Sequence, residues 1–130
     1  MTRHRAGSIQ AAIAAVGFLG TATLHSTGYS SVVDLAAGVP SELGVLMPAL
    51  WLVFSLDLAV LGLIVAAVAW RPFGGTRLIL GLAALSPLGA AGLQLTSIGF
   101  VPPTAILLVV ALLSVSAAVT LPSTSPPQAV

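Results

Sequence analysis

Three side chains that can exchange protons or form strong hydrogen bonds lie inside long apolar stretches of this sequence: His25, Asp57 and Gln94. A charged aspartate within a membrane span costs about 2.5 to 3.5 kcal/mol, so Asp57 should face the protein interior and either find a partner or stay protonated. His25 is its only titratable candidate partner at a similar depth. A contact between them would be an ion pair, or would hold a neutral histidine in one tautomer. These residue types predict proton handling or ligand binding.

The same residues also fit a structural role, in which a polar clasp joins two helices and His25 simply lies at the interface. Three hydroxyl groups extend the cluster. Thr21 lies one helical turn below His25 on the same face, Ser97 follows Gln94 by three residues, and Tyr29 lies close in sequence. Both interpretations remain open, and the candidate ligand-binding or proton-handling residues are His25, Asp57, Gln94, Thr21, Ser97 and Tyr29.

The composition places these residues in a lipid bilayer. Of 130 residues, 58% are hydrophobic and only 5% are charged, whereas soluble domains carry about 25% charged residues. The absence of cysteine excludes a disulfide scaffold. Four basic residues are too few for an electrostatic surface that binds nucleic acid. The low share of charged residues also excludes a cytosolic enzyme.

Four apolar runs predict an all-α integral membrane protein, an antiparallel bundle of four transmembrane helices. We expect spans at about residues 8–28, 44–70, 78–100 and 104–121, which form one domain over residues 1–121. Residues 122–130 are rich in proline and serine and predict a disordered cytoplasmic tail. The first run is also compatible with a secretory signal peptide, although it is longer than the usual apolar region of one.

The four arginines indicate the orientation. Arg3 and Arg5 precede the first span, and Arg71 and Arg77 flank the turn between the second and third spans. All four then lie on one side of the bundle, which the positive-inside rule makes cytoplasmic, with both termini inside. The lack of lysine and asparagine beside abundant alanine and glycine favours a GC-rich bacterial genome, and hence a multi-pass protein of the bacterial inner membrane.

Counting residues along the predicted helices places the polar side chains at similar depths in the membrane. Trp51 and Trp70 are 19 residues apart, or about 28 Å along a helix, and so match the two interfacial aromatic belts. Asp57 then lies roughly 9 Å below the outer interface. The same count along the other spans brings His25 and Gln94 to similar heights, which predicts a polar pocket in the outer leaflet.

The first loop, residues 29–43, is longer than an antiparallel turn requires. Its apolar residues predict a partial lid over the outer pocket, formed as a short helix capped at Asp34 or Ser31.

The residues that several kinds of cofactor binding and catalysis require are missing from this sequence. Two histidines at opposite ends of one span cannot hold a haem together, and there is no serine motif of the GxSxG type and no carboxylate pair. We therefore expect no cofactor and no metal, and an enzyme is the less favoured class.

Three stretches carry a resemblance to known proteins: residues 24–29 after the first span, residues 50–58 in the second, and residues 99–104 before the fourth. In these stretches the chain resembles a group of small bacterial four-span membrane proteins to which no activity is assigned. The resemblance implies a multi-pass membrane protein and brings no reaction with it.

Our leading interpretation is a small integral membrane protein that binds a lipid, a hydrophobic ligand or a membrane-protein partner through the outer-leaflet pocket. The second is a proton-coupled transporter, or a subunit of one, that uses Asp57 and His25. The third is an intramembrane enzyme. Beyond the bilayer itself, we expect a homo-oligomer or a larger membrane complex.

Overall fold

The computed structural model describes residues 3–39 and 42–121, and within these ranges the regular structure is entirely helical. Four helices are long and apolar enough to cross a membrane, which is the number of long apolar helices that the sequence predicted. A fifth, short helix follows the first one. The helices are α1 (Arg3–Thr27), α2 (Tyr29–Ala36), α3 (Glu42–Trp70), α4 (Thr76–Ser97) and α5 (Pro102–Thr120). The predicted tail, residues 122–130, lies outside the described residues.

The breaks between the helices occur at glycine and proline residues, as their conformational preferences require. α3 ends at Trp70, before Arg71 and Pro72. α4 ends in a turn at Gly99, whose φ of +82° is accessible mainly to glycine. α5 then begins with two prolines at its first helical positions, where the missing amide protons are not needed.

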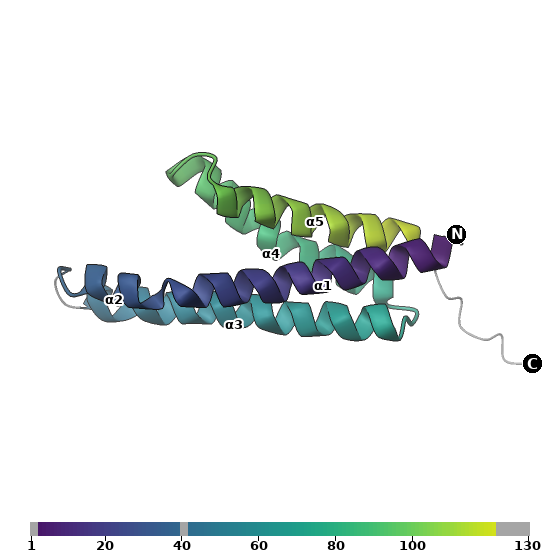
Figure 1. Cartoon of the computed structure of the whole chain (residues 1–130), viewed down its shortest axis with the longest axis horizontal. Helices are drawn as coiled ribbons and strands as arrows, with labels where there is room; N and C mark the ends of the chain where they lie inside the picture. The colour runs from purple at the N-terminus through teal and green to yellow at the C-terminus, as the bar shows by residue number, and fades with distance from the viewer. Residues whose placement is uncertain (1–2, 40–41, 122–130) are drawn as a thin grey trace, which may run out of the picture.

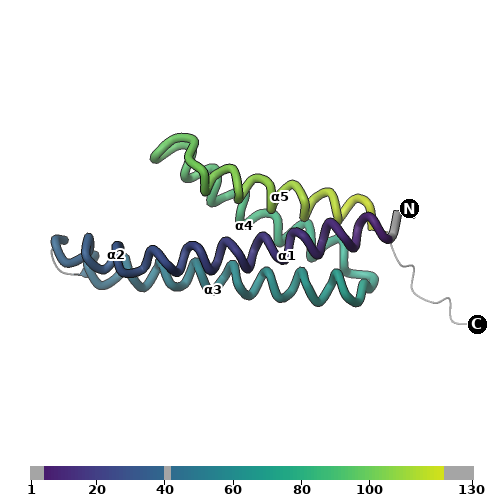
Figure 2. Tube along the Cα trace, viewed as in Figure 1, coloured from purple at the N-terminus to yellow at the C-terminus, as the bar shows by residue number. Residues whose placement is uncertain are grey.

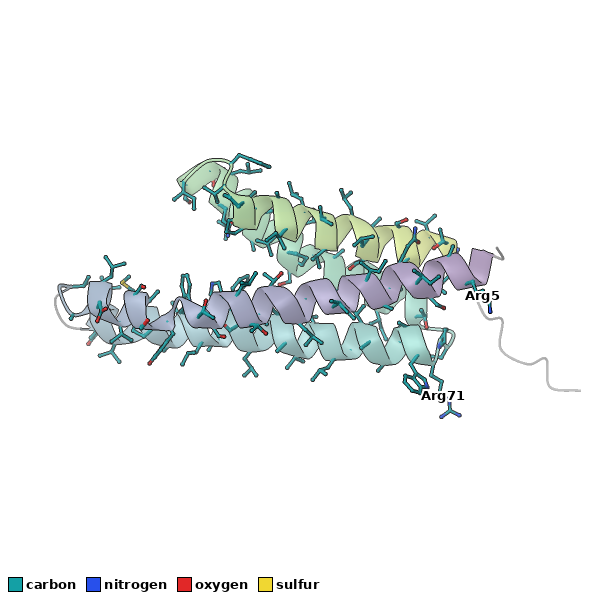
Figure 3. All side chains as sticks on the ribbon, in the orientation of Figure 1. Arg5 and Arg71 are labelled. Atoms are coloured by element: carbon teal, nitrogen blue, oxygen red, sulfur yellow. The ribbon has the colours of Figure 1, made fainter. Side chains whose placement is uncertain are left out.

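The long helices form two antiparallel hairpins, α1 with α3 and α4 with α5. α1 also packs along α5, whereas α3 and α4 touch only slightly. Figures 1 and 2 show that the hairpins lie together near the N-terminus and diverge toward the opposite end. We call the first end the arginine end, after Arg5, Arg71 and Arg77, and the second the splayed end, which carries the α1–α2 break and the turn between α4 and α5. Figure 3 shows Arg5 and Arg71 together at the arginine end.

The core lies where α1 passes between α3 and α5. Phe18 on α1 is completely buried, as are Leu58 on α3 and Leu80 on α4. Small residues allow this close packing. A Cβ atom added at Gly17 would lie only 2.6 Å from Cγ2 of Val110 on α5. The two hairpins are therefore joined through the glycine-containing face of α1.

Polar contacts add to the packing at the arginine end. The Thr120 hydroxyl oxygen lies 2.9 Å from Oε1 of Gln10, a polar contact that joins α5 to α1. Arg77 on α4 donates from Nη2 to the carbonyl oxygen of Val119, also at 2.9 Å. Val119 lies in the last turn of α5, where a cation is favoured by the helix dipole. The ends of three helices are thus linked here.

The short helix α2 differs from the prediction in its start. It begins at Tyr29 directly after Gly28, and neither Ser31 nor Asp34 caps it. The amide of Val32 bonds to the carbonyl oxygen of Gly28 at 3.1 Å, so the helix restarts as soon as α1 ends. α2 continues roughly along the direction of α1 and packs on α3.

Candidate functional site

Divergence of the hairpins leaves a cleft of about 460 Å³ at the splayed end. The first wall is formed by α1 and α3, and the second by α4, the α4–α5 turn and α5. Most of the lining side chains are apolar, and among them lie a histidine and a glutamine. The lining residues are Thr21, Leu24, His25, Trp51, Phe54, Gln94, Ile98, Val101, Pro103, Ile106 and Leu107.

His25 is held on the first wall by three residues of α3. Its Nδ1 atom lies 2.9 Å from the hydroxyl oxygen of Ser55. Its ring stacks on Trp51, with ring centroids 3.8 Å apart and an angle of 17° between the planes. Phe54 meets the ring edge-on at 4.9 Å. These contacts leave little freedom for the imidazole to rotate.

The break after α1 explains how Trp51 reaches this position. A Cβ atom at Gly28 would lie 2.8 Å from Cζ2 of Trp51, so only glycine leaves room for the indole there. The indole Nε1 donates a hydrogen bond to the carbonyl oxygen of His25 at 2.6 Å. This carbonyl also accepts the amide of Gly28 at 3.1 Å, at the point where the helical ladder of α1 ends. Trp51 therefore fastens the end of α1 to α3.

Gln94 is held on the opposite wall by the turn between α4 and α5. Its Oε1 accepts a hydrogen bond from the hydroxyl of Thr104 at 2.8 Å. The same hydroxyl accepts the amide of Val101 at 3.4 Å. The amide of Gly99 bonds to the carbonyl oxygen of Gln94 at 3.0 Å and closes the end of α4. The glutamine side chain is thus oriented by the first turn of α5.

Thr21 also lines the cleft, as its spacing from His25 predicted. Its hydroxyl donates to the carbonyl oxygen of Gly17 at 2.7 Å, within its own helix. The hydroxyl proton is therefore bonded within α1, and the oxygen can still accept a hydrogen bond. Of the six candidates, the structure brings His25, Gln94 and Thr21 together in one cleft.

Asp57 is not part of this group. Its side chain is exposed, and the structure records no hydrogen bond between it and any other described residue. His25 bonds to Ser55 instead, two residues earlier on α3. Two helical residues correspond to a rotation of about 200°, so the side chains of Ser55 and Asp57 point in nearly opposite directions. The hypothesis that Asp57 faces the interior and meets His25 is therefore corrected.

Ser97 and Tyr29 are exposed and do not line the cleft. The lid hypothesis is wrong for the same cleft, because none of its lining residues comes from the described part of the loop, residues 29–39 and 42–43. α2 instead contributes Val32 and Leu35 to a separate, more open hollow of about 450 Å³, which also reaches His25.

The residues that sequence reasoning missed are those that hold the candidates in place: Trp51, Phe54, Ser55 and Thr104. Trp51, Phe54 and Ser55 follow one another at spacings of three and one, so they share a face of α3. Trp51 was assigned only to an interfacial belt. A tryptophan four residues before a serine in a largely aliphatic helix was the available signal for this face.

The chemistry available in the cleft is hydrogen bonding in an apolar setting. No arginine, lysine, aspartate or glutamate lines it, and the described residues contain no group of three side chains that could hold a metal ion. His25 and Gln94 each have one nitrogen, both called Nε2, that makes no hydrogen bond to another described residue. Neither nitrogen is a buried atom without a partner, so both are accessible from outside the protein.

Fold and site together define an all-helical protein with four candidate membrane spans and a largely apolar cleft between two helical hairpins. Comparisons of this chain with protein-family models, with curated protein sequences and with solved structures find no match. The function is therefore argued from the cleft.

Proposed function

We propose that this is a multi-pass protein of the bacterial inner membrane that binds a lipid or another hydrophobic ligand in the cleft at its splayed end. The single observation that supports this most is the cleft itself, which is apolar, lies between two hairpins and contains His25 and Gln94. Ligand sites typically combine an apolar lining with a few placed polar groups, in volumes of about 300 to 1,000 Å³.

The rim of the cleft supports a ligand that shares the bilayer with the protein. Leu24 and Ile98 line the cleft and are 62% and 67% exposed, respectively. In a membrane these side chains would contact acyl chains. A lipid can therefore place its head between His25 and Gln94 while its chains remain among other lipids.

The proposed orientation has both termini in the cytoplasm and the cleft in the outer leaflet. Its support is the position of Arg5 and Arg71 at one end of the bundle, where Arg77 also bonds to the last turn of α5, because basic residues favour the cytoplasmic side. The chain has no cysteine, so single cysteines report topology without background. We expect Gly74→Cys to be protected from an impermeant maleimide in intact cells, and Ser30→Cys to react. The reverse pattern would contradict the orientation.

Quenching of Trp51 fluorescence tests ligand binding directly. The chain has two tryptophans, and Trp51 lines the cleft whereas Trp70 is 90% exposed. In a Trp70→Phe variant in detergent, we expect a lipid brominated near its head to quench Trp51 saturably, at about one lipid per protein.

A Trp51→Phe variant is the matched control, because only Trp70 then remains. Its quenching should rise in proportion to the lipid in the micelle, without saturation. Proportional quenching of Trp51 as well would contradict a binding site in the cleft.

The proton-coupled alternative depended on Asp57 and His25 acting as a pair. The described residues place Asp57 on the exposed side of α3 and His25 against Ser55. The observation that favoured transport over ligand binding is therefore missing, and ligand binding is the function that the geometry supports best.

The exposed carboxyl of Asp57 supports one further part of the proposal, a contact between two copies of the chain through α3. A carboxyl that faces acyl chains is costly, and interhelical hydrogen bonds relieve such a cost. We expect Val60→Cys, on the same exposed side of α3, to form a disulfide-linked dimer in membranes. Val109→Cys on α5 is the control, and Asp57→Ala should lower the dimer fraction. Equal cross-linking at both positions would contradict this contact.

A further inference from the structure

We propose that the cleft selects a neutral amphiphile whose head carries a hydroxyl group, such as a diacylglycerol. This inference rests on the proposed function and specifies the chemistry of the ligand. It follows from the hydrogen-bonding character of the two accessible nitrogens, one on each wall of the cleft, and from the lack of charge around them.

The tautomer of His25 follows from its contact with Ser55. The hydroxyl of Ser55 donates its single proton to the carbonyl oxygen of Trp51, at 3.1 Å. That proton is then not available for the 2.9 Å contact with Nδ1 of His25. Both contacts are hydrogen bonds at the same time only if Nδ1 carries the proton and donates it to the Ser55 oxygen. In a neutral imidazole this leaves Nε2 with a lone pair, so it is a hydrogen-bond acceptor.

Gln94 presents the opposite character on the second wall. Thr104 is completely buried, and its hydroxyl oxygen already accepts the amide of Val101. The hydroxyl proton of this buried side chain needs an acceptor, and Oε1 of Gln94 lies within hydrogen-bond distance of it. This fixes the orientation of the glutamine amide, whose NH₂ group remains as a hydrogen-bond donor.

A hydroxyl group combines the two complementary characters in one oxygen atom. It can donate its proton to an acceptor such as Nε2 of His25, and it can accept a proton from a donor such as the amide of Gln94. An ester or ether oxygen accepts only, so it can use the glutamine but leaves the histidine without a partner. Phosphate and carboxylate heads carry a charge, and no cationic side chain lines the cleft to pair with it.

Competition between two matched lipids tests this selectivity. The probes are 1,2-dioleoylglycerol and 1,2-dioleoyl-3-acetylglycerol, which share both acyl chains and differ in whether the third position is a hydroxyl or an acetyl ester. Each is titrated against the brominated lipid bound to the Trp70→Phe protein. We expect the free hydroxyl to displace the quencher at a concentration roughly tenfold lower than the acetate, the factor that one good hydrogen bond supplies.

Substitution of Ser55 separates the tautomer from the packing of the cleft. Ser55→Ala removes the acceptor that holds the proton on Nδ1. The ratio between the displacing concentrations of the acetate and of the free hydroxyl should then fall from about ten toward one, while both lipids still bind. Ser55→Thr retains a hydroxyl at the same position and should keep the preference. Asp57→Asn is the control, since Asp57 does not line the cleft.

A spectroscopic measurement keeps the inference testable if the Ser55 variants fail to fold. The chain has two histidines, so a His4→Gln variant contains His25 alone. Its ¹⁵N spectrum should show Nδ1 protonated and Nε2 unprotonated, with Nε2 shifting when dioleoylglycerol binds. A protonated Nε2 in the neutral ring would overturn the inference.

The outcomes distinguish this inference from the proposed function. Tenfold selectivity for the hydroxyl that depends on Ser55 supports both. Equal displacement by the two lipids, or preference for the acetate or for dioleoylphosphatidic acid, overturns the hydroxyl selectivity and leaves ligand binding standing. No displacement by any lipid, with no saturable quenching of Trp51, overturns both.

Discussion

The two ends of this molecule are built from the same kinds of helix, yet one is closed and the other is open. At the arginine end, small residues bring α1 against α5, and side chains of Gln10, Thr120 and Arg77 link neighbouring helices. At the splayed end the polar side chains link helices only within each hairpin, His25 to Ser55 and Gln94 to Thr104. Each hairpin therefore has polar side-chain contacts between its own two helices at the splayed end. The contacts that join one hairpin to the other lie toward the arginine end.

This difference has a physical origin in side-chain size. α1 and α5 approach closely where Gly17 faces Val110. Toward the splayed end, the walls carry Trp51, Phe54 and Ile106, which are too large for an equally close approach. Bulky side chains on opposed walls keep the hairpins apart, and the space between them is the cleft.

The largest contrast is expected between a core residue and a cleft residue. Phe18→Ala removes a completely buried ring and should lower the free energy of unfolding in mixed micelles by about 3 to 5 kcal/mol. Ile98→Ala removes a side chain that is 67% exposed at the cleft rim and should change it by only about 0.5 kcal/mol. Similar losses for the two variants would mean that the splayed end is packed as tightly as the core.

The junction of the hairpins is tested by adding one methyl group. Gly17→Ala places a Cβ 2.6 Å from Cγ2 of Val110, so α5 must shift, and we expect a loss of about 1 to 3 kcal/mol. Gly20→Ala lies one turn further along α1, where a Cβ would meet nothing within 4 Å. It should leave stability unchanged or raise it by up to about 1 kcal/mol, because alanine favours the helix. A stabilising effect at both positions would show that α1 and α5 are not in close contact.

The partner of His25 is tested by double-mutant cycles. We expect His25→Phe and Ser55→Ala to couple by about 0.6 kcal/mol, the average for hydrogen bonds between membrane helices, for which the maximum is about 1.7 kcal/mol. His25→Phe and Asp57→Asn should be additive, because their side chains do not meet. Coupling of His25 with Asp57, but not with Ser55, would restore the sequence-based pairing.

The smallest effect is expected at the surface of the arginine end. Arg77→Met removes the hydrogen bond to the carbonyl oxygen of Val119 and should cost less than about 1 kcal/mol, with the loss reduced by salt. Arg71→Met is the matched control, since Arg71 is exposed and the structure records no side-chain hydrogen bond from it to another described residue. Equal effects for the two would show that Arg77 does not hold α5.

The four long helices were predictable because hydropathy and helix-breaking residues depend on local sequence. The expected spans overlap α1, α3, α4 and α5, with their ends displaced by a few residues. The short helix α2 was also expected, but its start at Tyr29 was not. That start depends on Gly28 accommodating Trp51 from another helix, a contact that no local pattern in residues 29–43 describes.

The height of the site residues along the helices was predictable from the sequence. The side of each helix that faces its neighbours was not. Counting residues along each span placed His25 and Gln94 at one height, and both line the same cleft. The same count could not tell which side of α3 faces α1, because that helix is apolar on every side. Buried residues of α3 recur at Ser55, Leu58, Gly62 and Val65, a stripe with helical spacing. Asp57 is two residues after Ser55 and therefore lies outside this stripe, on the exposed side of α3.

Distance measurements between spin labels test the central claim, that the hairpins are joined at one end and held apart by a ligand cleft at the other. One pair would label exposed positions at the splayed end, Thr27→Cys and Ser97→Cys, and the other pair the arginine end, Arg71→Cys and Val119→Cys. We expect a broad distance distribution for the first pair that narrows when dioleoylglycerol is added, and a narrow one for the second that does not change. Equally narrow distributions at both ends, unaltered by lipid, would contradict the claim.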